Sequence, residues 1–141
     1  IRPKCRMSCR SSHSTFHTHI PIIQGEADNK EKADRVNSIL DAIENLSLTV
    51  KGNLDNAEPV FVVGGLSDRK THYFENVVKV EEDRLVVSKD LIEKVAKGYN
   101  VGLLRGQTFI NEGEIEEKLN PMSVMSFFDK LREDVNAYFE I

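Results

Sequence analysis

One short stretch of the chain constrains the fold more than any other. Residues 60–63 read Val-Phe-Val-Val, directly after Pro59. Successive side chains of a strand point to opposite faces, so a run that is apolar at every position predicts a strand in the middle of a sheet rather than at its edge. We therefore expect a sheet built around this segment.

Helices are predicted on three segments. Apolar residues recur at three- and four-residue spacing between about Asn29 and Leu48, which indicates an amphipathic helix that Asp28 or Asn29 caps. Ser88 is expected to cap a second helix that runs to Lys97. A third is expected from residue 120 onward. The predicted buried stripes are Val36, Ile39, Leu40, Ile43 and Leu46 in the first helix, and Met122, Met125, Phe128, Leu131, Val135 and Tyr138 or Phe139 in the last.

Further strands are predicted from alternation and turns. Residues 15–23 alternate with period two, and Pro21 within them favours an edge strand or a strand end. Residues 81–83 form a predicted hairpin turn, with a returning strand at 84–87, and residues 101–104 read as another strand. Strands and helices in this mixed order predict an α+β fold, with helices packed on one mixed or antiparallel sheet.

Charge divides the chain into two unequal parts. The first 24 residues hold four basic and no acidic side chains, whereas the remainder holds all 23 acidic residues. We expect residues 1–24 to be an irregular basic leader that ends in an edge strand, and residues 25–141 to be a single α+β domain. An acidic body disfavours a protein that coats nucleic acid through bulk charge, but it permits a local basic site. The first residue is Ile, which suggests a processed chain or a fragment.

Two absences in the sequence bear on membrane contact and on cellular location. No apolar run approaches the roughly 18 residues that cross a bilayer, so no membrane partner is expected. Two cysteines do not make a disulfide scaffold, so we expect a reducing, cytoplasmic location.

A zinc site is one hypothesis for the basic leader. Cys5, Cys9, His13 and His17 follow one another at four-residue intervals, and four such ligands make a closed tetrahedral site. On a helix they would share one face. The alternative is a leader without metal, followed by a strand with exposed histidines; on that alternative the chain has no cofactor.

A loop that binds an anion is a second hypothesis. Gly64 and Gly65 follow the apolar run and precede a basic tip. Glycine lets a backbone approach a phosphate, and Arg and Lys neutralise it. A small-ligand or nucleotide-binding domain could use this loop, although neither standard phosphate-loop motif is present. The alternative is a β-bulge followed by a solvated hairpin tip.

Basic residues at loops and strand ends are candidates for binding a nucleic-acid backbone. They would converge on an anionic strand if the strands that they follow are neighbours in one sheet. The candidates for binding a nucleic-acid backbone are Lys51, Arg69, Lys70, His72 and Arg105.

No nucleophile in the sequence has an evident base and orienting group, so no enzymatic activity is predicted.

From Arg35 onward the sequence resembles the backbone subunit of CRISPR Cascade complexes, the DevR-like family of type I systems. The matching pieces are RVNSILDAI at residues 35–43, Gly52-Asn53, and PVFVVGGL at residues 59–66, with a looser match around residues 76–78 and 103–106. The match spans the last three quarters of this chain and only the carboxyl-terminal part of the family's sequence. One departure concerns residues 54–58, which are acidic where relatives often carry basic residues.

The resemblance implies a fold and a function. The fold would be a modified ferredoxin-like palm of the RNA-recognition-motif type, and this chain would form the carboxyl-terminal portion of a longer subunit. The subunit would associate head to tail with other copies of itself and with other Cascade subunits in antiviral defence. It would hold the guide RNA by its backbone, so that the guide's bases can pair with target DNA. The resemblance carries RNA contact over to Lys51, Arg69 and Lys70.

Overall fold

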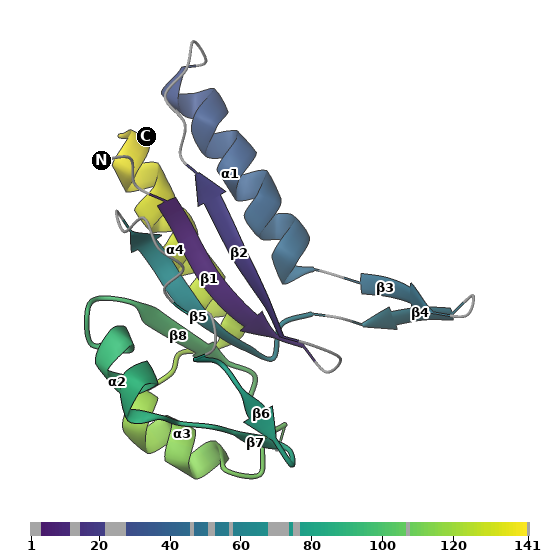
Figure 1. Ribbon diagram of the computed structural model, residues 1–141. Coiled ribbons are helices and arrows are strands. Elements are labelled where there is room, and N and C mark those ends of the chain that lie inside the picture. Colours follow the sequence, from purple (N-terminus) through teal and green to yellow (C-terminus); the bar gives the residue numbers. More distant parts are fainter. Residues whose placement is uncertain are drawn as a thin grey trace.

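The computed structural model describes residues 4–11, 15–21, 28–45, 47–50, 53–56, 58–67, 74, 77–106 and 108–140. Figure 1 shows helices packed against a central sheet, with two small hairpins beside it. The strands are β1 (Lys4–Arg10), β2 (Thr15–Pro21), β3 (Ser47–Val50), β4 (Asn53–Asn56), β5 (Phe61–Ser67), β6 (Val80–Glu81), β7 (Arg84–Leu85) and β8 (Asn100–Leu103). The helices are α1 (Asn29–Glu44), α2 (Lys89–Val95), α3 (Glu112–Leu119) and α4 (Val124–Phe139).

The main sheet has four strands in the order β2-β1-β5-β8, and every neighbouring pair is antiparallel. The expected α+β class is therefore confirmed. The apolar run forms β5, which lies between β1 and β8 as predicted for a central strand. The segment with Pro21 forms β2, the outer strand, and Pro21 is its last residue. Both positions match the expectation, because a proline cannot donate to a ladder within a sheet.

The amino-terminal segment is the clearest departure from expectation. Residues 4–10 were expected to be irregular, but they form β1, which pairs with β2 on one side and with β5 on the other. The physical reason is a second alternation: Cys5, Met7 and Cys9 are buried on one face and their neighbours point to the opposite one. The basic charge of the segment concealed this pattern.

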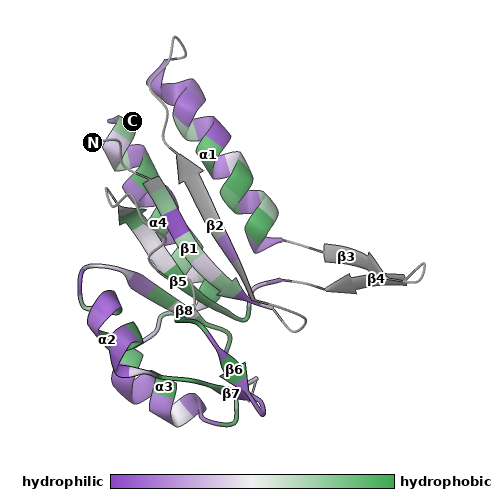
Figure 2. Ribbon diagram, in the orientation of Figure 1, coloured by the Kyte–Doolittle hydropathy of each residue, from purple (hydrophilic) through white to green (hydrophobic). Residues whose placement is uncertain are grey.

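Two apolar clusters cover the two faces of the sheet, as the colours of Figure 2 help to follow. The first joins β1 to α1 and α4, and Val62 of β5 belongs to it. The second joins Phe61 and Val63 of β5 to β8, α2 and α3. Because neighbouring residues of β5 enter different clusters, this strand is buried from both sides.

The helix boundaries differ in part from those predicted. Asp28 caps α1 as expected, through its side chain and the Glu31 amide, but α1 ends at Glu44 and the following residues form β3. Helix α4 begins at Val124, because the Ser123 side chain caps it by accepting from the Ser126 amide. Its buried residues are Phe127, Phe128, Leu131, Val135 and Phe139, whereas Met125 of the predicted stripe is exposed. Ser88 caps α2, as predicted.

The two glycines of β5 are not a loop. Gly64 pairs with Met7 on one side and with Asn100 on the other, so the strand continues through it. A Cβ at Gly64 would lie 2.2 Å from the Arg6 carbonyl oxygen and 2.6 Å from the Met7 Cβ. The glycine is therefore needed for close packing of β1 against β5, which corrects the hypothesis of a phosphate-binding loop at this position.

The chain connects these layers in an unusual order. Hairpin β1–β2 comes first, α1 then leads to β5 on the other side of β1, and α4 follows β8. Since β2 and β5 are both antiparallel to β1, they are parallel to each other, and α1 forms the crossover between them. A separate hairpin, β3–β4, follows α1 and extends away from the sheet (Figure 1).

Candidate nucleic-acid interface

Strand β1 has one apolar and one polar side. Its apolar side packs under α1 and α4, whereas Arg6, Ser8 and Arg10 alternate on the other side. Arg6 and Ser8 are buried and Arg10 is half-buried. Two arginines on one side of an inner strand are uncommon, since charged side chains are rarely buried unless they are paired, and both make contacts within the protein. We define this side of β1, together with His17 of β2, as the polar strip.

His17 joins the polar strip through the register of the hairpin. It lies opposite Ser8, on the same face of the sheet, and its side chain is exposed. Ser8 Oγ and His17 Nδ1 are 2.5 Å apart, which is hydrogen-bond distance. The polar strip therefore presents the exposed His17 and the half-buried Arg10, and the buried Ser8 hydroxyl is hydrogen-bonded to His17. Groups of this kind bind phosphate and ribose oxygens.

Two residues border the polar strip: Gly65 of β5 and Tyr99, which directly precedes β8. Gly65 lies opposite Arg6, and a Cβ there would be 3.3 Å from the Tyr99 ring. Tyr99 donates its hydroxyl proton to Ser67 Oγ at 2.7 Å and meets the Phe74 ring edge to face, with centroids 5.0 Å apart. The Tyr99 ring is thus held in place where the strip meets the second apolar cluster.

Most of the predicted RNA contacts fall outside the described part of the chain: Lys51, Arg69, Lys70 and His72. Arg105 is described, and its guanidinium is engaged within the protein. It donates through Nε to Glu116 of α3 and through Nη2 to the Pro121 carbonyl at 2.8 Å. These contacts join the end of β8 to α3 and to the α3–α4 connection, and RNA binding by Arg105 stays a prediction.

The predicted zinc ligands are not brought together among the described residues. Cys5 and Cys9 lie on the apolar side of β1, about 13 Å apart along the strand at its usual rise. His17 is on the opposite face, and His13 lies outside the described residues. A four-residue spacing gathers ligands on a helix but separates them on a strand. No group of three or more metal-binding side chains occurs in the part of the chain that the structure describes.

Both thiols are held neutral by their surroundings. Burial raises the pKa of Cys5 to about 12. Burial raises the pKa of Cys9 further, with a smaller contribution from the nearby Cys5. Zinc binds the thiolate form, which an apolar environment disfavours. The two cysteines therefore act as small apolar side chains of the core.

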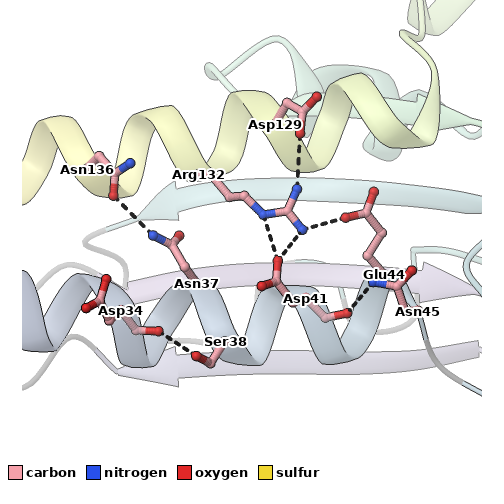
Figure 3. A network of polar contacts seen from close by, with 9 residues as sticks. All are labelled: Asp34, Asn37, Ser38, Asp41, Glu44, Asn45, Asp129, Arg132 and Asn136. Carbon is pink, nitrogen blue, oxygen red and sulfur yellow. Dashed lines mark hydrogen bonds and ion pairs between the residues drawn. The ribbon is translucent and has the colours of Figure 1, made fainter.

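A second group of charges lies between α1 and α4, and it is acidic. Figure 3 shows Arg132 of α4 facing Asp41 and Glu44 of α1 and Asp129 of its own helix. Three carboxylates surround one guanidinium, so this surface repels a nucleic-acid backbone. The hairpin β6–β7 and α3 form an open depression of ≈ 620 Å³, lined by Glu81, Glu82 and Glu114 with one arginine, Arg84. It is also unsuited to a polyanion.

The sequence contains a signal for the polar strip that its charge concealed. Apolar and polar residues alternate along residues 5–10, and a second alternating run begins at Thr15. Two such runs separated by a few residues rich in Ser and His indicate a β-hairpin. Applied to both runs, the hairpin rule would have placed Ser8 and His17 on one face.

Comparison with known proteins returned no match: no family model, curated protein or solved structure is similar to this chain. Among the described residues, none of the helices is both long and apolar enough to span a membrane.

Proposed function

We propose that the protein is a structural subunit that binds the guide RNA of a CRISPR effector complex, and that the polar strip contacts the ribose-phosphate backbone. The subunit would bind the guide by charge and shape and leave the bases free to pair with target DNA. The proposal assigns no catalytic step to the chain. Its other partners would be further copies of itself and other subunits of the complex.

The two-sided character of β1 carries this proposal. Only Cys5, Met7 and Cys9 of the strand enter the core with α1 and α4, and the remaining four positions are Lys4, Arg6, Ser8 and Arg10. A strand that only had to be buried on its second side would carry apolar residues there, as β5 does. Arg10 is half-buried and His17 of β2 is exposed, so these two members of the polar strip are the ones placed to meet an anionic chain.

The fold is compatible with a palm of the RNA-recognition-motif type, which is part of the proposal. Such a palm is a four-stranded sheet with its helices on one face and its RNA on the other. Here α1 and α4 pack on one face of the sheet, and on the opposite face the polar strip of β1 lies beside the second cluster, in which α2 and α3 cover β5 and β8, so this palm would have helices on both faces. The order of elements differs from the usual β-α-β-β-α-β, since hairpin β1–β2 precedes α1, so the palm would be a modified one.

The overall charge supports contact at a few local groups. The chain has a formal charge of −4, and the acidic network between α1 and α4 lies on the face that the helices cover. A protein of this charge binds RNA through a limited number of phosphates, because long-range attraction is absent.

Binding of a fluorescent single-stranded RNA over a range of salt concentrations tests the proposal. Arg10→Gln removes one positive charge from the polar strip. We expect weaker binding and a salt slope reduced by about 0.7, the value for one phosphate contact on a single strand. Lys89→Gln is the matched control, because Lys89 is on α2 with a side chain 90% exposed, and removes the same charge elsewhere.

The two variants separate local contact from bulk charge. Equal loss of affinity in both would mean that only net charge matters. Wild-type affinity and slope in Arg10→Gln, with its thermal unfolding midpoint unchanged, would show that the polar strip does not bind RNA.

A further inference from the structure

The main sheet has two outer strands, and they differ in what lies beside them. Beyond β8, the segment before α4 continues the ladder: the Leu103 amide donates to the Met122 carbonyl at 2.9 Å, and the Met122 amide donates to the Val101 carbonyl at 2.9 Å. Beyond β2, no strand of the described part of the chain is paired. Within the described part of the chain, the outward main-chain groups of β2 thus have no strand partner, which makes β2 the open edge of the described sheet.

Strand β2 also lacks the features that protect an edge. Its residues read TFHTHIP, with no Lys, Arg, Asp or Glu. Its pairing with β1 is regular over all seven residues, from Arg10 opposite Thr15 to Lys4 opposite Pro21, without a bulge. Natural edge strands usually carry charges, a bulge or a central proline, which prevent pairing with a strand of another chain. The one proline of β2, Pro21, is its last residue.

We propose that β2 pairs antiparallel with β2 of a second copy of this chain, which extends the sheet across a two-fold axis. An edge of main-chain donors and acceptors selects an extended strand as its partner. An uncharged strand can lie against its own copy without repulsion, whereas it offers nothing to steer a charged peptide.

The geometry also limits the assembly to two copies. A two-fold contact uses the same strand on both sides, so it closes on itself. Because Met122 pairs beside β8, β2 is the edge that remains in the described sheet. Once two copies have paired through β2, the described sheet has no further edge for a third copy. This contact is distinct from the head-to-tail association that the family resemblance implies, and it does not require RNA.

A register centred on Thr18 would use all of β2. It places His17 of one copy opposite position 19 of the other, and brings the two His17 residues to diagonal positions on one face. Diagonal neighbours in an antiparallel pair are about 7–8 Å apart, within reach of long side chains. His17 is exposed in the single chain, so a long polar side chain fits there; the substitution also removes the contact with Ser8, and the fold of each variant is therefore checked.

Sedimentation velocity of the RNA-free protein, over a range of concentrations, tests the pairing. We expect a monomer–dimer equilibrium for the wild type. His17→Lys and His17→Glu should each dissociate the dimer at least several-fold more readily, because like charges then meet across the axis. An equimolar mixture of the two variants should recover the dimer. Ser38→Lys is the control, since Ser38 is exposed on α1 and gains the same charge away from β2.

Each outcome decides the matter once circular dichroism has shown that the variants keep the wild-type fold. Recovery in the mixture, with Ser38→Lys behaving as wild type, supports pairing through β2. A wild type that stays monomeric, grows beyond two copies, or forms a dimer indifferent to both His17 variants would overturn it. RNA binding takes no part in this measurement, so the proposed function stands or fails separately.

Discussion

Arg132 on α4 donates two hydrogen bonds to the carboxylate of Asp41 on α1, from Nε at 3.0 Å and from Nη2 at 2.6 Å. The same guanidinium also reaches Glu44. Asp41 is the more exposed of the two carboxylates, with 62% of its side chain accessible against 19% for Glu44. Solvent screening therefore weakens the pair that has more hydrogen bonds.

Double-mutant cycles should rank these pairs by burial rather than by number of bonds. We expect the coupling of Arg132 to Glu44 to be about 1–2 kcal/mol, as for a hydrogen bond to a charged group, and its coupling to Asp41 to be below about 1 kcal/mol. Urea unfolding of the alanine variants measures both. The exposed pair Lys130–Asp134 is a reference for a surface contact. A larger coupling for Asp41 than for Glu44 would contradict the ranking.

Gly64→Ala should destabilise the protein markedly. The added Cβ would overlap the Arg6 carbonyl oxygen and the Met7 Cβ, and neither can move without separating β1 from β5. We expect the free energy of unfolding to fall by about 1–3 kcal/mol, as for overpacking in a core. Gly113→Ala is the control, because a Cβ on this residue of α3 meets nothing within 4 Å and should stabilise the helix by about 0.5–1 kcal/mol.

The two cysteines should be inert in the folded protein. Burial keeps both thiols neutral and out of reach of solvent, and it raises the pKa of Cys5 to about 12. A thiol reagent such as DTNB at pH 8 should therefore modify neither of them until urea unfolds the chain. The same protection should persist after dialysis against a chelator. Rapid labelling that begins only when metal is removed would favour the zinc hypothesis instead.

Glu114 should contribute to the dependence of stability on pH. Its hydrogen bond from Asn111 and its contacts with Lys118 lower the pKa of this carboxyl below its ordinary value. A lowered folded-state pKa means that the contribution is present above the ordinary glutamate pKa and is lost as pH falls through the folded-state pKa. Unfolding free energies of wild type and Glu114→Gln, measured from pH 7 to acid, should converge as pH falls. Parallel curves would contradict this.

The basic tip after β5 provides a further prediction for RNA binding. Arg69 and Lys70 lie outside the described residues, and the family resemblance assigns them to the guide. Replacing both with alanine should weaken RNA binding and flatten its salt dependence. When the double alanine variant is combined with Arg10→Gln, the losses in salt slope should add, because each cation that neutralises a phosphate displaces its own counterions from the RNA. Wild-type binding by the double alanine variant would remove these two residues from the interface.

Local patterns predicted the elements whose apolar residues follow one period without interruption. The run at 60–63 and the serine cap of α2 are of this kind. In α1 the pattern placed Val36 and Leu40 in the core, but Ile39 of the predicted stripe is 43% exposed. The start of α4 was misplaced, because the Ser123 cap decides it and Pro121 precedes the helix. The role of Gly64 was missed, since a close approach of β1 is a tertiary contact that no local pattern contains.

The candidate site was harder to predict than the fold. Cysteines and histidines at equal spacing raised zinc as one of two hypotheses, and the register of β1 and β2 puts Cys9 and His17 on opposite faces. Of the five predicted RNA contacts only Arg105 lies within the described residues, and its ion pair with Glu116 on α3 could not be predicted from its position after a strand. Partners that come from distant segments decide which cations remain available, and a single sequence does not contain that information.

The salt dependence of single-stranded RNA binding by the wild-type protein tests the central claim most directly. We predict measurable binding whose logarithm falls linearly with the logarithm of salt concentration, with a slope of about −0.7 for each phosphate neutralised by the polar strip and the neighbouring basic residues. Absence of binding at low salt, or affinity independent of salt, would contradict the account.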